Sequence, residues 1–196
     1  LEYYKSIGKE HYFIYDEVGY FYEGFAKVEL EGKGWNFINP QGELLWKGDE
    51  WFDWVGDFVE GFASVKKEGL GWNYINTQGE LLLKGDKWFE YVGEFYEGFA
   101  KVEIIGLGWN YINTKCEYLW KGDKWFDYAC SFFPNGLAEV EYKGDWYKLN
   151  TKGELYDEAG DRVNIGLQES KSGVIKLTES DIHKLVIKTL KEYLLK

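Results

Sequence analysis

Short stretches of alternating apolar and polar residues fill most of this chain. Residues 24–30 alternate with a period of two, which is typical of a half-buried β-strand. The strand face expected to be buried consists of Ala26, Val28 and Leu30. A glycine-rich turn at 31–34 leads into an aromatic strand at 35–39, and a third short strand is expected at 43–46. The pattern has no helical periodicity here, so it predicts antiparallel hairpins.

The same pattern recurs when the sequence is shifted on itself by about 37 residues. One position is held by Trp35, Trp72, Trp109 and Trp146. Glu-Gly-Phe-Ala recurs at 23–26, 60–63 and 97–100, and becomes Asn-Gly-Leu-Ala at 135–138. Trp-Phe recurs at 51–52, 88–89 and 125–126. The period predicts four units, at 14–50, 51–87, 88–124 and 125–161, and residues 1–13 are interpreted as a stub or the remnant of a preceding unit.

A turn of the form Asn-x-x-Gly follows the aromatic strand in each unit, as at Asn39–Gly42. Asn at the first position and Gly at the last fit a type I turn followed by a residue with positive φ. The third unit has Cys116 in place of the glycine. We expect a cost of ~1 kcal/mol there if the backbone needs positive φ.

One unit cannot bury both faces of its hairpins, so neighbouring units are expected to stack. The predicted fold is therefore an all-β tandem repeat array, with a closed propeller-like ring as the alternative. Residues 162–196 are expected to form a capping strand and an amphipathic α-helix, with Thr178 as its N-cap. This helix either covers the end of the array or docks on a partner.

Composition and charge narrow the possible functions. The net charge is −11, and residues 162–196 contribute +3, which leaves −14 for residues 1–161 (−11 minus +3). An acidic body of this kind repels nucleic-acid phosphate, and no apolar run is long enough to span a membrane. The two cysteines, Cys116 and Cys130, are interpreted as incidental thiols. The compartment is left open, with the cytoplasm favoured.

The repeated motif resembles that of the bacterial WG-repeat family, also called KWG repeats. The resemblance covers about residues 14–161 and is carried by Glu-Gly-Phe-Ala-x-Val, Gly-Trp-Asn-[Phe/Tyr]-Ile-Asn, Gly-Glu-Leu-Leu and Trp-Phe-[Asp/Glu]. The family often has Trp-Gly at the hallmark position, whereas here Gly precedes Trp35 and Asn36 follows it. The resemblance implies a binding or scaffolding role, and no common catalytic activity is attached to the repeat.

The sequence contains no arrangement typical of an enzyme. The two histidines, His11 and His183, have no partner at motif spacing, and the acidic residues recur in every unit as turn or strand-edge residues do. Neither a metal site nor a cofactor site is predicted. We therefore expect a protein without catalytic activity.

The recurrent aromatic residues are the candidate binding surface. Trp35, Ile38, Phe52 and Phe58 are expected in the core. Two other sets are expected on the surface, because one becomes Lys148 in the fourth unit and the other shares a polar strand face. These candidate binding residues are Phe37, Tyr74 and Tyr111, and Phe25, Phe62 and Phe99. Together they would form an exposed aromatic ladder, unless a second layer or the terminal helix covers them.

The predicted function is a binding or scaffolding module that recognises another protein with a basic or mixed surface. One alternative is a binder of carbohydrate or choline-type ligands, because exposed Trp and Tyr stack on sugars and enclose cations. Another alternative is an acidic mimic of nucleic acid that inhibits a DNA-binding protein. Oligomeric state and partner identity are left open.

Overall fold

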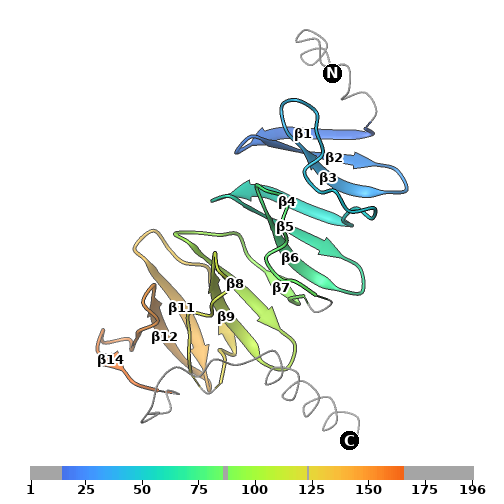
Figure 1. The fold of residues 1–196 in the computed structure, drawn as a ribbon. Helices are drawn as coiled ribbons and strands as arrows, with labels where there is room; N and C mark the ends of the chain where they lie inside the picture. The colour runs from blue at the N-terminus through green and yellow to red at the C-terminus, as the bar shows by residue number, and fades with distance from the viewer. Residues whose placement is uncertain (1–14, 86–87, 123, 166–196) are drawn as a thin grey trace, which may run out of the picture.

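A computed structural model describes residues 15–85, 88–122 and 124–165 as a series of small antiparallel β-sheets (Figure 1). One sheet falls in each of the first three predicted units, the fourth sheet extends from the fourth unit into the predicted C-terminal segment at Arg162–Val163, and the described residues contain no helix. The all-β prediction is thus confirmed. The expected C-terminal helix lies outside the described residues.

Each of the first three units folds into a three-stranded sheet in chain order. The first contains β1 (Glu17–Tyr22), β2 (Phe25–Leu30) and β3 (Gly34–Ile38). The second contains β4 (Trp54–Val59), β5 (Phe62–Lys67) and β6 (Gly71–Asn76). The third contains β7 (Tyr91–Val92), β8 (Phe99–Ile104) and β9 (Gly108–Asn113). The fourth contains β10 (Tyr128–Ala129), β11 (Leu137–Tyr142), β12 (Asp145–Asn150), β13 (Leu155–Tyr156) and β14 (Arg162–Val163).

The alternation along each central strand sets its buried face. In β2, Ala26 and Val28 are fully buried and Leu30 is partly buried, as the period of two predicts. The equivalent alanine and valine of β5, β8 and β11 are buried as well. Tight turns with positive φ at Glu23 (47°) and Gly24 (88°) connect β1 to β2. Two successive positive φ values match the twist of a hairpin, so the Glu-Gly pair fixes the register.

The Asn-x-x-Gly turn also forms as predicted. The Gly42 N–H donates to the Asn39 carbonyl at 2.9 Å, and the Asn39 side chain accepts the N–H groups of Gln41 and Glu43. Gly42 has φ of 82°, and Cys116 takes the same conformation with φ of 61°. The positive φ on which the expected cost at Cys116 depends is thus present.

Consecutive units are joined through the Gly-Trp and Trp-Phe motifs. Trp35 of the first unit and Phe52 of the second exchange two backbone hydrogen bonds, of 2.7 and 3.0 Å. Gly34 has φ of 93°, and a Cβ there would lie 2.4 Å from the Phe52 carbonyl oxygen. The equivalent pairs are Trp72 with Phe89 and Trp109 with Phe126. Glycine precedes these tryptophans because the next unit approaches the backbone closely.

A second link between units runs through the Glu-Gly turns. The Glu23 carboxylate accepts the N–H groups of Glu60 and Gly61 at 2.9 and 2.7 Å. The Glu60 carboxylate binds Glu97 and Gly98 in the same way, at 2.7 and 2.8 Å. The recurrent glutamate therefore links neighbouring units, because its carboxylate accepts hydrogen bonds from two backbone N–H groups in the turn of the next unit.

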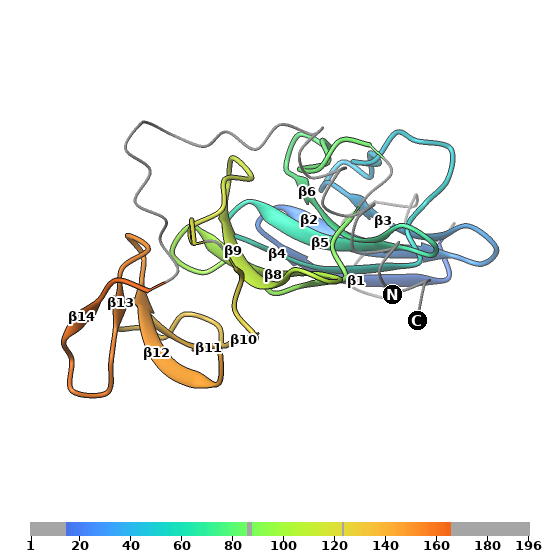
Figure 2. The same ribbon diagram turned by 90° about the horizontal axis from the view of Figure 1, so that it is seen from below.

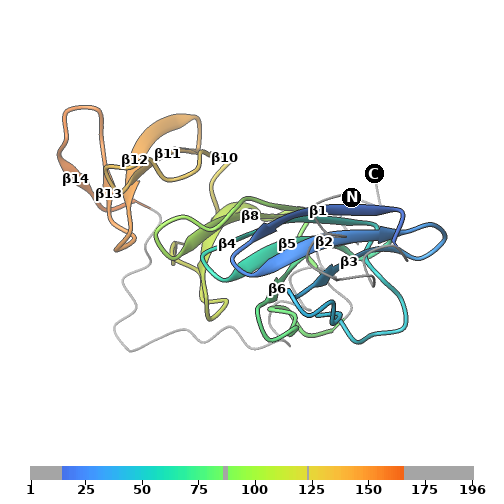
Figure 3. The same ribbon diagram turned by 90° about the horizontal axis from the view of Figure 1, so that it is seen from above.

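The sheets follow one another along the array and do not close into a barrel (Figure 1). Seen from below and from above, the first three sheets overlie one another, and the fourth lies to one side of them (Figures 2 and 3). The hydrophobic core is correspondingly divided into four clusters, each with aromatic residues contributed by two adjacent units at the junctions.

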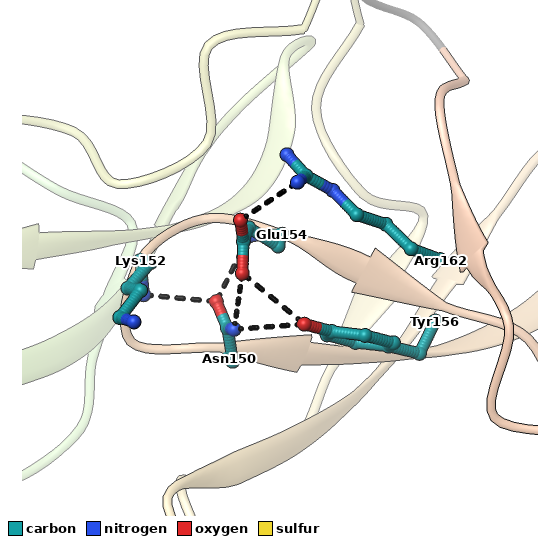
Figure 4. A network of polar contacts seen from close by, with 5 residues as sticks. All are labelled: Asn150, Lys152, Glu154, Tyr156 and Arg162. Carbon is teal, nitrogen blue, oxygen red and sulfur yellow. Dashed lines mark hydrogen bonds and ion pairs between the residues drawn. The ribbon is translucent and has the colours of Figure 1, made fainter.

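The fourth unit ends differently from the others. Asp145 replaces the glycine before the tryptophan, and the sheet continues instead through β13 and β14. A polar network holds this end together (Figure 4). The Glu154 carboxylate accepts hydrogen bonds from Asn150 (2.9 Å) and Tyr156 (3.1 Å) and pairs with Arg162 at 3.0 Å. The Asn150 amide, more than any other group, holds the pKa of Glu154 below its ordinary value.

Candidate functional site: an exposed aromatic stripe

The expected exposure of Phe37, Tyr74 and Tyr111 is wrong, because all three side chains are buried. The next unit covers each of them. The Tyr74 hydroxyl donates to the Gly93 carbonyl of the third unit at 2.5 Å, and its ring packs on Phe95 with centroids 4.8 Å apart. Burial raises the pKa of both tyrosines far above its ordinary value.

Lys148 occupies the equivalent position in the fourth unit and is exposed. The inference drawn from this lysine fails for a physical reason. In the first three units the position faces the following unit, whereas in the fourth unit it does not. At this position a charged side chain meets solvent in the fourth unit, whereas in the first three units it would be buried.

Phe25, Phe62 and Phe99 are partly buried. Their rings also pack against the following unit: Phe25 lies 4.9 Å from Phe58, and the equivalent distances are 4.7 and 5.9 Å. Phe58, Phe95 and Phe132 therefore insert between the two predicted sets of aromatic residues. The predicted ladder is an interface between units, and it does not form the surface that the sequence suggested.

A different set of aromatic residues is exposed. In the second, third and fourth sheets, the first and third strands each contribute one aromatic residue. The two aromatic residues of a sheet lie on either side of the same residue of the second strand. They are Trp54 and Trp72, Tyr91 and Trp109, and Tyr128 and Trp146, with Lys66, Glu103 and Glu141 between the two members of each pair. Residues directly opposite one another share a sheet face. We call these six residues the aromatic stripe.

The exposure of the aromatic stripe is large for such side chains. Trp54 is 46% exposed, Tyr91 41%, Tyr128 45% and Trp146 46%, while Trp72 and Trp109 are partly buried. Exposed aromatic groups gathered on one face usually mark a surface that binds something.

The rings of the aromatic stripe contact one another along the array. Trp54 and Trp72 lie 5.0 Å apart, centroid to centroid, within the second unit. From the third unit onward the contacts are continuous: 5.3 Å from Tyr91 to Trp109, 6.0 Å from Trp109 to Tyr128 and 6.0 Å from Tyr128 to Trp146. These distances are typical of favourable tilted aromatic pairs, so neighbouring rings hold each other in place.

Lysines lie over two tryptophans of the aromatic stripe. The ammonium group of Lys66 is 5.4 Å from the Trp72 ring centroid, and that of Lys101 is 5.1 Å from the Trp109 ring. Both distances fall within the range of cation–π attraction. The faces of these rings therefore already attract positive charge within this protein.

A pocket opens beside the last tryptophan of the aromatic stripe. It has a volume of about 250 Å³. It is lined by Glu139, Trp146, Tyr147, Lys148, Asp157 and Glu158. Three of these side chains are acidic and one is basic, so the pocket combines an exposed indole ring with an excess of negative charge.

Sequence reasoning missed the aromatic stripe, although a signal was present. Position 54 recurs as Tyr91 and Tyr128, always two residues after the buried phenylalanine of Trp-Phe. Along a strand, residues two apart share a face. The phenylalanines are nevertheless buried, because the adjoining unit covers them. The missing information was therefore the placement of the neighbouring unit.

Within residues 15–85, 88–122 and 124–165, no group of three or more His, Cys, Asp or Glu residues is placed to hold a metal ion. Cys116 and Cys130 are free thiols, and burial raises the pKa of Cys116. That same part of the chain has no helix long and apolar enough to cross a membrane.

Small antiparallel sheets joined in series by one recurring motif define an all-β tandem-repeat protein. The family model described as "WG containing repeat" matches residues 12–33, 52–70 and 72–106. These matches support a WG-repeat protein, as the resemblance of its motifs predicts. No curated protein matches it in sequence.

Solved structures with a similar arrangement include two computationally designed proteins, Ika8 and Ika4. Ika8 has 12% identity and a TM-score of 0.45 over 80% of this chain and 53% of its own. Ika4 has 12% identity and a TM-score of 0.41 over 68% of this chain and 88% of its own. BamB from Moraxella catarrhalis has 13% identity and a TM-score of 0.38 over 81% of this chain and 53% of its own. The chain thus spans about half the length of Ika8 and of BamB.

Proposed function

We propose that this protein is a non-catalytic binding module that recognises another protein through the aromatic stripe. The observation that carries the proposal is the exposure of Trp54, Tyr91 and Tyr128 on the first strands of successive sheets, together with that of Trp146 on the third strand of the last sheet. Aromatic side chains lose little conformational entropy on binding and dominate the energetics of protein interfaces. A row of them held rigid by neighbouring rings is well suited to that role.

The charge of the chain favours a basic or mixed partner. Residues 1–161 carry −14, which is −11 for the whole chain minus +3 for residues 162–196. Complementary charge accelerates encounter and selects against acidic partners. An acidic body disfavours nucleic acid, which also needs positively charged groups along its phosphates.

A repeated surface suits an extended partner. The aromatic stripe follows the direction in which the sheets succeed one another, since its members come from the equivalent strands of successive units. An extended segment that runs along the array would meet an aromatic pair in each of the last three units. Contacts repeated in this way add affinity without requiring any single strong contact.

Carbohydrate binding is a second candidate, because exposed indole and phenol rings also stack on sugars. The rings of the aromatic stripe are tilted by 55–59° to one another along the continuous part, so they do not form one flat platform. This geometry suits side chains that insert between rings better than a sugar chain lying across them. We therefore rank carbohydrate binding below protein binding.

The test is capture of partners from native lysate at low and moderate salt, with the full chain as bait. One variant carries Trp54→Ser, Tyr91→Ser and Tyr128→Ser. Its matched control carries Tyr20→Ser, Tyr22→Ser and Tyr96→Ser, which are exposed aromatic residues outside the aromatic stripe. We expect a protein that is recovered by the wild type and the control and lost by the stripe variant.

Equal recovery with all three baits would overturn the proposal. A glycan panel followed by intrinsic tryptophan fluorescence separates the second candidate, since a sugar response lost in the stripe variant alone would favour carbohydrate binding. A competing DNA duplex in the capture step checks whether any recovered protein binds the acidic body as a nucleic-acid mimic. In that case the duplex would release it.

A further inference from the structure

The fourth unit differs from the second and third in the charges around its stripe tryptophan. Lys66 lies directly opposite Trp72 and its ammonium group lies over that ring. Lys101 lies on β8 and covers Trp109. Each of these two tryptophans therefore has an internal cation on its face.

In the fourth unit both lysine positions are acidic. Glu141 lies opposite Trp146, as Lys66 lies opposite Trp72, and Glu139 takes the position of Lys101. Among residues 15–85, 88–122 and 124–165, no lysine or arginine lies over the Trp146 ring. Its 46% exposure leaves that ring open to an external group.

The pocket beside Trp146 has a size and charge suited to a cationic side chain. Its volume of about 250 Å³ exceeds that of a lysine or arginine head group, so a charged tip and part of its stem can enter. Lys148 is the one basic residue that lines it, and it lies directly opposite Glu139 on the neighbouring strand. Asp157 and Glu158 remain as acidic residues at the pocket, and Glu141 lies opposite Trp146.

We infer that the Trp146 pocket binds a lysine or arginine side chain supplied by the partner protein, in the place that Lys66 and Lys101 take in the preceding units. The inference rests on the proposed function, because it names the chemical feature that the partner presents to the end of the aromatic stripe. Cation–π attraction to Trp146 and the surrounding carboxylates would act together on the same charge.

The choice of a separate basic partner follows from charge complementarity. A second copy of this chain would bring another acidic array, since residues 1–161 carry −14 (−11 minus +3). Like charges placed together at an interface oppose association. A segment with regularly spaced lysines or arginines brings the opposite charge to the aromatic stripe and to the pocket.

The experiment is a titration of the full chain with an end-blocked peptide of alternating lysine and glycine. The tryptophans of the protein are replaced by 5-fluorotryptophan, and binding is followed by fluorine NMR. The fluorine signal of Trp146 is assigned by its loss in Trp146→Leu. We expect that signal to shift on titration and the affinity to fall about tenfold in Trp146→Leu, in line with a partly desolvated cation–π contact. Glu158→Gln is expected to weaken binding of the lysine peptide and to make that binding less sensitive to salt.

Two controls separate this inference from general charge attraction. A peptide with norleucine in place of lysine keeps the aliphatic stem and removes the charge, and we expect it to leave the Trp146 signal unchanged. Trp109→Leu removes a ring that Lys101 already covers, and it should change the affinity less than Trp146→Leu. Equal loss in both variants, or no response of the Trp146 signal to the lysine peptide, would overturn the inference.

The failure of the inference can be told apart from failure of the proposed function. One outcome is that the stripe variant loses the captured partner while Trp146→Leu binds it as well as the wild type does. That outcome supports the proposed function and rejects the assignment of the pocket. If the stripe variant retains the partner, the proposed function itself falls, whatever the peptide titration shows.

Discussion

In each of the first three units, one buried asparagine binds the backbone of the segment that follows the Asn-x-x-Gly turn. Asn73 is fully buried; its amide donates to the Leu83 carbonyl at 3.0 Å, and its carbonyl oxygen accepts the Leu83 N–H at 3.0 Å. Asn36 and Asn110 bind Trp46 and Trp120 in the same way. The side chain thus acts as a partner for the backbone N–H and carbonyl groups of a segment ten residues away, and these groups are partly buried.

Replacement of Asn73 by alanine should therefore destabilise the fold. It leaves the Leu83 N–H and carbonyl groups without their partner, so we expect the free energy of unfolding to fall by about 2–4 kcal/mol. Urea denaturation followed by circular dichroism measures it. Gln78→Ala, at an exposed turn position, is the control and should stay within ~0.5 kcal/mol. A similar small change for both would show that the Asn73 contacts contribute nothing.

The Asp127 carboxylate makes the stability of the fold depend on pH in the acidic range. Lys124 binds its carboxylate at 2.7 Å and the Lys143 N–H donates to it at 2.6 Å; the Lys124 hydrogen bond in particular lowers its pKa. A carboxyl with a lower pKa in the folded state stabilises the fold above its unfolded pKa. That contribution is lost as the pH falls through the folded value.

Asp127→Asn should thus be less stable than the wild type at about pH 7 and equally stable at a pH below the lowered pKa of the folded Asp127 carboxyl, where that carboxyl is protonated. Urea denaturation at both pH values gives the difference. At acidic pH the comparison is between asparagine and a protonated, uncharged aspartate. If the difference in free energy of unfolding were the same there as at neutral pH, it would not come from the charge of Asp127.

At the residue scale, the sequence predicted the conformation of Cys116 but not the burial of Asn73. The periodic alignment placed Cys116 on glycine positions whose turn chemistry is local, and local geometry can be derived from neighbouring residues. Asn73 recurs just as regularly. Its role depends on a segment ten residues away, and the spacing alone does not show which backbone groups that segment leaves unpaired.

The hairpin of β5 and β6 offers a direct test of how units are joined. Gly69 and Gly71 both have positive φ, of 78° and 105°. A Cβ at Gly69 meets nothing within 4 Å, whereas one at Gly71 would lie 2.5 Å from the Phe89 carbonyl oxygen of the next unit. Alanine at either position therefore strains the backbone, but only at Gly71 does it oppose the junction.

We expect Gly69→Ala to lower the free energy of unfolding by ~1 kcal/mol, the cost of a left-handed conformation for alanine. Gly71→Ala should cost clearly more, because the hydrogen bonds between Trp72 and Phe89 must lengthen as well. Hydrogen exchange of the Trp72 and Phe89 amides gives a second measure, and both should exchange faster in Gly71→Ala alone. Equal costs for the two variants would contradict the close approach.

At the element scale, the strands and turns of each unit were predicted well because their signals are local. The alternation at 24–30, the aromatic strand at 35–39 and the Asn39–Gly42 turn appear where the sequence indicates them. The third strand expected at 43–46 does not form, and Leu44 makes only an isolated bridge with Ile38. What the sequence did not predict was the bond between Trp35 and Phe52, which crosses from one unit to the next. Hydrophobic periodicity identifies a strand and does not name the strand that it pairs with.

At the scale of the whole molecule, the array determines which aromatic residues meet solvent. Phe37, Tyr74 and Tyr111 are covered by the following unit, and Trp54, Tyr91 and Tyr128 remain exposed. Both sets recur with the same period, so repetition alone could not distinguish them. The distinction requires knowing how far one sheet is offset from the next, which is a property of the packed array.

The aromatic stripe also gives the array a direction. Its tryptophans carry lysines in the second and third units and acidic neighbours in the fourth, where the pocket beside Trp146 lies. A partner with basic side chains would therefore be oriented with its charge toward the fourth unit. This asymmetry distinguishes an ordered docking surface from a row of equivalent sites.

The measurement that tests the aromatic stripe most directly is hydroxyl-radical footprinting of the full chain, free and bound to the captured partner, with mass spectrometric readout of each aromatic residue. The account predicts lower oxidation of Trp54, Tyr91, Tyr128 and Trp146 in the complex, while Tyr20 and Tyr96 keep the oxidation of the free chain. Protection of Tyr20 and Tyr96 with unchanged oxidation of the aromatic stripe would contradict it and would place the interface on another face.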